Sequence, residues 1–213
     1  MRDNPVAVKT RTMALEGPAV LKPRQVRDLL DASDCRTRLG KRDSALAAVL
    51  ANGLRIGEAV HLVRDNIDLA PNGVVRLTVK TSKTRAGTPA RWRTVTMFPQ
   101  SARRICAYIW DADPRWWVFS GRHGEPLGTR QARRIIKGLL NSVGAGQYRV
   151  HDLRHTYASI VVRETRSIFV AQKLLGHSDP RITSRAYAQW DTTDSDNAAL
   201  AVAGALTRRD RGR

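Results

Sequence analysis

The sequence predicts a mainly α-helical fold with a small antiparallel β-sheet, which is an α+β architecture. Apolar residues recur at helical spacing through most of the chain, whereas one interval, 67–98, alternates between apolar and polar residues. The chain has 213 residues and a hydrophobic fraction of 42%, which is enough for a substantial core. No internal repeat is visible. We therefore expect one mainly helical domain with a short sheet inserted in it.

Three helices are expected before the alternating interval. Pro23 suits the first position of a helix, because the nitrogen of proline has no hydrogen to donate. Residues 44–52 are predicted to form a second, apolar helix, which Gly53 is well placed to end. A short third helix, 55–62, follows directly.

The sheet is predicted from alternation and turn residues. Within 75–80 the apolar side chains point to one face and the polar ones to the other. An Asn-Gly pair at 72–73 marks a turn before this strand, and the segment 85–89 marks a loop after it. Alternation resumes at 95–97. A sheet of two or three antiparallel strands explains this pattern most simply.

Helical periodicity then returns for most of the remaining chain. Apolar stripes run over 102–109, 135–143, 150–161 and 168–175. The stretch 111–128, with its proline and tryptophan residues, is predicted to be an ordered connection between the first two of these helices.

Charge gives the first indication of function. Lysine and arginine together number 37 against 19 acidic residues, a net charge of +18. Such a field favours a polyanionic partner, foremost a nucleic acid, although a small-molecule enzyme with a basic surface is an alternative. Cys35 and Cys106 are isolated and are expected to be buried thiols in a reducing compartment, with a disulfide between them as the alternative that counting allows. The absence of an apolar run long enough to cross a membrane favours a soluble, non-exported protein.

Two pairs of residues have the spacing of neighbours on one helix face. His151 and Arg154 are three residues apart, at the edge of an apolar stripe, so we expect them at the rim of the core. Arg55 and Glu58 have the same spacing, and the carboxylate is placed to orient the guanidinium. A solvated polar face and an ordinary surface ion pair are the alternatives for these two pairs.

A metal site is a competing interpretation of the histidines. His151 and His155 are four residues apart, with Asp152 between them, and His177 offers a third ligand. This would make the protein a zinc-dependent hydrolase. The positive charge of Arg154 opposes a bound cation at this place, and the net charge of the chain acts in the same direction.

Five segments together resemble the tyrosine recombinases, the phage integrase family. They are Gly-Leu-Arg-Ile-Gly-Glu-Ala-Val-His-Leu at 53–62, Lys-Thr at 83–84, His-Asp-Leu-Arg-His-Thr at 151–156, Leu-Gly-His-Ser-Asp at 175–179, and Tyr187. Their order and approximate spacing agree with the family over about residues 20–190. The resemblance implies the integrase catalytic-domain fold.

The resemblance also implies the roles of individual residues. Arg55 and Arg154 correspond to the arginines that hold the scissile phosphate, and Tyr187 corresponds to the nucleophile. His151 matches the first histidine of the family pattern, and His177 the second histidine or tryptophan.

A lysine in the hairpin of the sheet is the general acid in the family. Lys83 matches it best, because a Lys-Thr pair at the hairpin entrance is followed by a long loop; Lys80 is the alternative. Glu58 and Asp152 are expected to support the neighbouring catalytic residues.

The implied activity is site-specific cleavage and rejoining of DNA through a covalent 3′-phosphotyrosine. It needs neither a cofactor nor a metal, because fixed cations neutralise the phosphate, and it needs no ATP, because the phosphotyrosine keeps the bond energy. The implied partner is double-stranded DNA at core recombination sites, with a monomer off DNA and a tetramer on paired sites. The implied location is cytoplasmic, at the bacterial nucleoid or in a phage-infected host. A topoisomerase and a non-catalytic DNA-binding regulator are the alternatives.

The expected organisation has three parts. Residues 1–19 are a basic linker or arm, 20–190 the catalytic domain, and 191–213 a tail with a short alanine-rich helix. This tail is expected to dock on a neighbouring protomer; packing on its own domain or remaining loose is the alternative. Family members usually have a further N-terminal helical domain. Without it, weak DNA affinity and poor site discrimination are expected.

Overall fold

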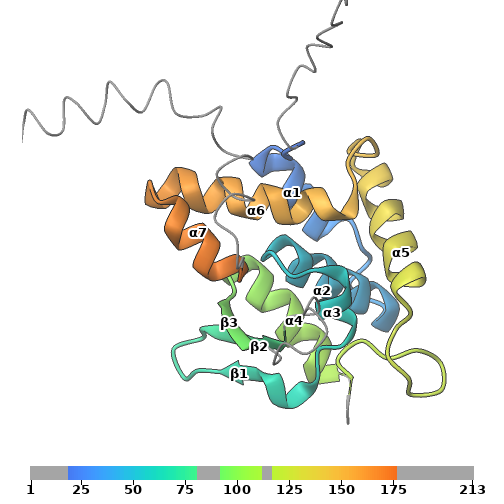
Figure 1. The fold of residues 1–213 in the computed structure, drawn as a ribbon. Helices are drawn as coiled ribbons and strands as arrows, with labels where there is room; N and C mark the ends of the chain where they lie inside the picture. The colour runs from blue at the N-terminus through green and yellow to red at the C-terminus, as the bar shows by residue number, and fades with distance from the viewer. Residues whose placement is uncertain (1–18, 81–91, 112–116, 177–213) are drawn as a thin grey trace, which may run out of the picture.

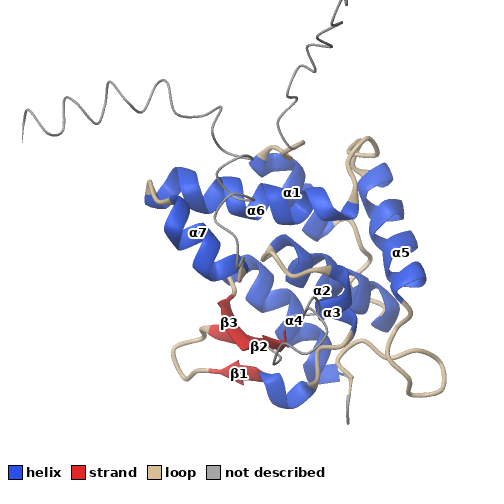
Figure 2. Ribbon diagram, viewed as in Figure 1, coloured by secondary structure: helices blue, strands red, loops and turns tan. Residues whose placement is uncertain are grey.

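The computed structural model describes residues 19–80, 92–111 and 117–176, and it confirms the predicted fold class. Helices surround a central helix, and a small sheet lies at one edge (Figures 1 and 2). The helices are α1 (Pro23–Asp31), α2 (Arg38–Ala51), α3 (Ile56–Val60), α4 (Pro99–Asp111), α5 (Thr129–Ser142), α6 (Val150–Thr165) and α7 (Ile168–Leu175). A short 3₁₀ turn, Arg64–Asn66, leads into the strands β1 (Ile67–Leu69), β2 (Val75–Lys80) and β3 (Trp92–Thr96).

Helix α2 forms the centre of the core. All of residues 44–51 are buried, and the helix contacts α1, α4, α5 and α6. It starts six residues before the apolar stretch that predicted it, because the Thr37 side chain caps the helix by accepting a hydrogen bond from the Gly40 amide, at 3.0 Å. The first turns of α2 are polar, so the hydrophobic pattern did not indicate where the helix begins. The predicted end is confirmed: Asn52 is the C-cap, and Gly53 follows with φ +84°.

The sheet has three antiparallel strands in the order β1-β2-β3. Leu77 in the middle strand pairs with Ile67 on one side and Val95 on the other, and all three side chains are buried. The predicted alternation is confirmed, because the apolar residues of β2 are buried while its polar residues are not. The sheet therefore covers one side of the helical core and leaves its other face toward solvent.

Helices α6 and α7 pack against each other and are joined by a tight turn (Figure 1). Arg166 ends α6 in the left-handed region, at φ 54°, and is the one residue other than glycine with positive φ in the described ranges. Gly176 ends α7 in the same region, at φ 64°. Thr156 ties α6 to the start of the fold, since its hydroxyl accepts from the Leu21 amide at 2.9 Å.

Several predictions concern residues beyond the described ranges. The basic arm, the hairpin residue Lys83, the residues His177 and Tyr187, and the alanine-rich tail all lie outside them. None of the helices in the described ranges combines the length and the apolar composition needed to cross a membrane.

Candidate active site

Glu58 and Arg55 form the first part of the site, at the start of α3. Arg55 is the N-cap of this helix, and its backbone amide donates to Glu58 Oε2 at 2.8 Å. The Arg55 guanidinium donates to Glu58 Oε1, also at 2.8 Å. The pairing predicted from the spacing is therefore confirmed. It is not a surface ion pair, because the Glu58 side chain is fully buried while that of Arg55 is 21% exposed.

Arg93 on β3 is a partner of Glu58 that the sequence did not reveal. Its two terminal nitrogens donate to the two carboxylate oxygens of Glu58, at 2.9 and 2.8 Å, in a bidentate pair. Its Nε donates to the Leu174 carbonyl on α7 at 3.2 Å. One guanidinium thus connects the sheet, α3 and α7. Arg93 occupies a position of β3 where the alternation calls for an apolar residue, since Val95 two residues later is buried. This break in the pattern is the one sign of its role in the sequence.

Arg154 on α6 is buried, with 2% of its surface exposed, so its expected place at the rim of the core is wrong. The guanidinium extends beneath α7 and donates to the Gly53 and Leu175 carbonyls, the latter at 2.6 Å. It also lies 3.9 Å from Glu58 Oε2. The helical period placed Arg154 on the correct face of α6, but it gave no sign that α7 covers that face.

Gly53 allows the turn after α2 to lie close against α6. A Cβ atom at this position would lie 2.6 Å from Cδ1 of Tyr157, so that one of the two would have to move, and the φ of +84° at Gly53 also favours glycine. The turn that ends α2 therefore brings a carbonyl to Arg154 and directs the chain to Arg55.

The electrostatics of this cluster keep Glu58 ionised. Burial alone would raise the pKa of Glu58, but the hydrogen bonds and charge of Arg93, the Arg55 amide and the charge of Arg154 outweigh it and hold the pKa below its ordinary value. Three guanidinium groups thus surround one carboxylate, and three positive charges less one negative leave a net charge of +2. A cluster with this excess attracts an anion.

His151 stands beside the cluster at the start of α6. Its ring meets that of His155 edge to face, with centroids 4.8 Å apart. Desolvation by its neighbours lowers the pKa of His151, and the charges of His155, Arg154 and Arg55 lower it further against an opposing effect of Asp152. Asp152 also accepts from the Arg149 amide at 2.7 Å and so caps the helix. At neutral pH His151 is therefore uncharged and able to accept a proton.

A proton titration tests this environment. We expect the His151 ring to titrate below 6.5, the ordinary histidine value. His155→Ala should raise its pKa, because that change removes both a neighbour that excludes water and a like charge. Two-dimensional NMR of the ring protons measures both values, and His61→Ala is the control, since His61 caps the end of α3 and contacts Trp117. An unchanged His151 titration in the His155 variant would contradict this description.

Lys80 lies at the end of β2, paired across the sheet with Trp92, and is exposed. It lines a cavity of about 520 Å³ that also reaches Glu58 and Trp117. Among the described residues, no three side chains of the metal-binding types come together. His177, the third ligand of the alternative zinc site, lies outside them.

Comparison with known proteins identifies the family. A model described as the phage integrase family matches residues 19–193. The chain belongs to the phage integrase family. Among curated members, the tyrosine recombinase XerD of Neisseria meningitidis serogroup B is 31% identical over 176 residues, covering 78% of this chain and 57% of XerD. The tyrosine recombinase XerC of Bacillus subtilis is 30% identical over 167 residues, covering 76% of this chain and 54% of XerC. This integrase-family chain thus spans little more than half the length of these relatives.

Solved structures of family members share the fold. The site-specific recombinase XerH, bound to palindromic difH substrate after cleavage, superposes with a TM-score of 0.70 at 17% identity, covering 89% of this chain and 54% of XerH. The XerA recombinase superposes with a TM-score of 0.67 at 24% identity, covering 84% and 65%. The catalytic domain of bacteriophage HP1 integrase has a TM-score of 0.55 at 21% identity, with 85% of this chain and 94% of that domain covered. The fold predicted from the resemblance is confirmed.

Proposed function

We propose that this chain is a site-specific DNA recombinase that cleaves and rejoins strands through a covalent 3′-phosphotyrosine at Tyr187. The observation that carries the proposal is the cationic cluster of Arg55, Arg93 and Arg154 around the buried Glu58. A phosphodiester is anionic and repels a phenolate until positive charge neutralises its non-bridging oxygens. Membership of the phage integrase family supports this chemistry.

In the proposed mechanism Arg55 and Arg154 hold the scissile phosphate. The five N–H donors of a guanidinium lie in one plane, and in Arg154 the bonds to the Gly53 and Leu175 carbonyls fix the orientation of that plane. The benefit to the reaction grows as charge accumulates on the phosphate oxygens in the transition state. We assign Arg93 to positioning, since both of its terminal nitrogens are bonded to the Glu58 carboxylate, and Glu58 in turn holds Arg55.

The proposed bond changes follow from the roles that the family resemblance implies for these residues. The Tyr187 oxygen attacks phosphorus while its proton passes to His151 or to water, and His177 donates a hydrogen bond to the phosphate. The bond to the 5′-oxygen breaks, and that oxygen takes a proton from Lys83, or from Lys80 in the alternative assignment. A 5′-hydroxyl then attacks the phosphotyrosine, which releases the phenol and restores a phosphodiester. Arginines supply the positive charge in place of a metal, and the phosphotyrosine keeps the bond energy, so the proposal includes neither a metal nor ATP.

DNA is the proposed macromolecular partner, contacted over an extended basic surface. Helix α5 supports this, because its exposed side carries four cations: Arg130, Arg133, Arg134 and Lys137. Cations along one helix neutralise successive phosphates and release counterions. On paired sites we propose a tetramer, and off DNA a monomer, on the strength of the family resemblance.

A suicide DNA substrate tests the proposal. The chain is expected to form a covalent adduct that survives denaturing electrophoresis, because a nick near the cleavage site lets a short fragment diffuse away and prevents rejoining. Tyr187→Phe should abolish the adduct while DNA binding persists, and Tyr148→Phe is the matched control. Adduct formation by the Tyr187 variant would disprove the assignment. DNA binding without any adduct would favour a regulator, and loss of the adduct on chelation would favour the zinc enzyme.

The leaving-group assignment has its own test. A substrate with sulfur at the 5′-bridging position needs no general acid, because a thiolate leaves without a proton. We expect Lys83→Ala to be slow on the ordinary substrate and to recover on the sulfur substrate, with Lys80→Ala close to the unmodified chain on both. If only the Lys80 variant recovers on the sulfur substrate, Lys80 and not Lys83 is the general acid.

A further inference from the structure

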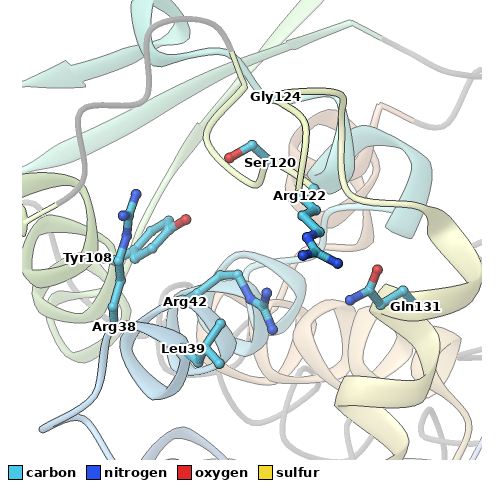
Figure 3. Close-up of a pocket in the computed structure, with 9 residues that line it drawn as sticks. Arg38, Leu39, Arg42, Tyr108, Ser120, Arg122, Gly124 and Gln131 are labelled. Atoms are coloured by element: carbon cyan, nitrogen blue, oxygen red, sulfur yellow. The ribbon is translucent and has the colours of Figure 1, made fainter.

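A second cluster of arginines lies outside the active site, around a cavity of about 560 Å³. Helix α2 contributes Arg38 and Arg42, and the loop after α4 contributes Arg122 (Figure 3). Tyr108 on α4, Ser120 in the same loop as Arg122 and Gln131 on α5 complete the polar side chains of the lining. None of the lining residues belongs to the cluster around Glu58.

Two of the arginine side chains in this cavity approach each other. In Figure 3 the guanidinium groups of Arg42 and Arg122 extend toward each other, while Tyr108 lies beside Arg38 with its hydroxyl turned toward the side of the cavity where Ser120 lies. Tyr108 itself is held firmly, because it is 4% exposed and stacks on Phe119 with centroids 5.8 Å apart and planes inclined by 4°. A phenolic hydroxyl held in this way is a fixed donor in the lining of the cavity.

The loop that carries Arg122 is also constrained. The Gly121 amide donates to the Glu125 carbonyl at 2.7 Å, and Gly124 turns the chain at φ +88°. The Glu125 carboxylate folds back onto the His123 amide, at 2.9 Å, and is not among the lining residues. Arg122 is therefore presented from a closed turn.

The cavity has an excess of positive charge. Asp43 neutralises Arg42, to which it is bonded at 2.7 and 2.9 Å. Neither Arg38 nor Arg122 forms an ion pair with any residue in the described ranges. Guanidinium groups that line one cavity repel one another unless an anion lies among them, so this arrangement is most stable with one bound.

We propose that this cavity binds the oxyanion of a phosphate ester, with Arg38, Arg42 and Arg122 as its charged ligands and the Tyr108 hydroxyl as a further donor. Guanidinium forks match the tetrahedral array of phosphate oxygens, and three of them from different directions suit it better than a planar carboxylate. The phosphate comes either from the DNA backbone, at a point remote from the scissile bond, or from a free phosphate ester. The first source rests on the proposed function, and the second does not.

A titration of the full chain with inorganic phosphate, at constant ionic strength, tests the chemistry. We expect saturable NMR shifts in the amides of 120–124 and in the arginine Nε–H groups lining the cavity. Arg38→Ala and Arg122→Ala should each weaken binding about tenfold, since a charge-assisted hydrogen bond is lost. Arg103→Ala, an exposed arginine on α4, should leave binding unchanged.

Tyr108→Phe serves as a gentler variant that retains the ring stack, and it should weaken binding without altering stability. Shifts that never saturate, equal binding of acetate, or binding indifferent to all three substitutions would overturn the proposal.

Duplex DNA distinguishes the two sources. If the ligand is a backbone phosphate, the slope of log K against log salt concentration should become shallower in the Arg38 and Arg122 variants. The change should be about 0.9 for each phosphate contact removed. An unchanged slope, with inorganic phosphate still bound, assigns the site to a free phosphate ester. Both readouts are independent of Tyr187, so failure of the adduct assay does not affect them.

Discussion

Glu58→Ala is expected to lower the free energy of unfolding by about 3–5 kcal/mol, the usual cost of removing one partner from a buried ion pair. The carboxylate is fully buried, receives two bonds from Arg93 and one from the Arg55 side chain, and caps α3 through the Arg55 amide. Without the carboxylate, the guanidinium groups of Arg55, Arg93 and Arg154 remain close together with little water to screen their repulsion, which destabilises the fold. Urea denaturation measures the loss.

Asp68→Ala is the matched control, because Asp68 also pairs with an arginine of the sheet, Arg76, but at 3.3 Å and with both side chains exposed. Its cost should not exceed about 1 kcal/mol. Equal losses in the two variants would show that the Glu58 cluster is not the structural centre described above. Glu58→Gln, which keeps the shape and one acceptor, should fall between them.

The same carboxylate predicts a dependence on pH. Because its pKa is lower in the folded chain than in the unfolded chain, the stabilisation is fully present above the unfolded value of about 4.3 and is lost as the pH falls through the folded value. Glu58→Gln should therefore remove part of the acid-induced loss of stability.

Arg154→Ala is expected to reduce the rate of adduct formation on the suicide substrate by about 10²–10³, the effect of removing one preorganised donor to a developing oxyanion. Arg154→Lys should recover little of this activity. A lysine keeps the charge but lacks the planar fork that reaches the Gly53 and Leu175 carbonyls and the phosphate together.

Folding must be separated from catalysis in this experiment. Circular dichroism and DNA affinity report whether the variants are folded, and Arg163→Ala is the control, since Arg163 lies on the same helix in an exposed pair with Glu164. Adduct formation by Arg154→Lys within a few-fold of the unmodified chain would contradict a direct role on the phosphate.

The sequence predicted local features of this protein better than tertiary ones. Alternation in β2 and the pairing of Arg55 with Glu58 depend on near neighbours, and both are confirmed. The bond from Arg93 to Glu58 spans 35 residues, and no local pattern encodes it. The burial of Arg154 likewise depends on α7, which lies elsewhere in the sequence. The early start of α2 is a smaller omission, caused by a capping threonine ahead of a polar turn.

The bonds that complete the arginine cluster also bear on the order of events during folding. Arg93 meets Leu174 across 81 residues, and Arg154 meets Gly53 across 101. Closing such long loops costs entropy that local helices do not repay, so contacts of this kind form late. On the ribosome, a nascent chain would build α1 to α5 before α7 emerges to meet Arg93 and Arg154. The arrangement of Arg154 that we propose for holding the phosphate is therefore complete only after α7 has packed against α6 and β3.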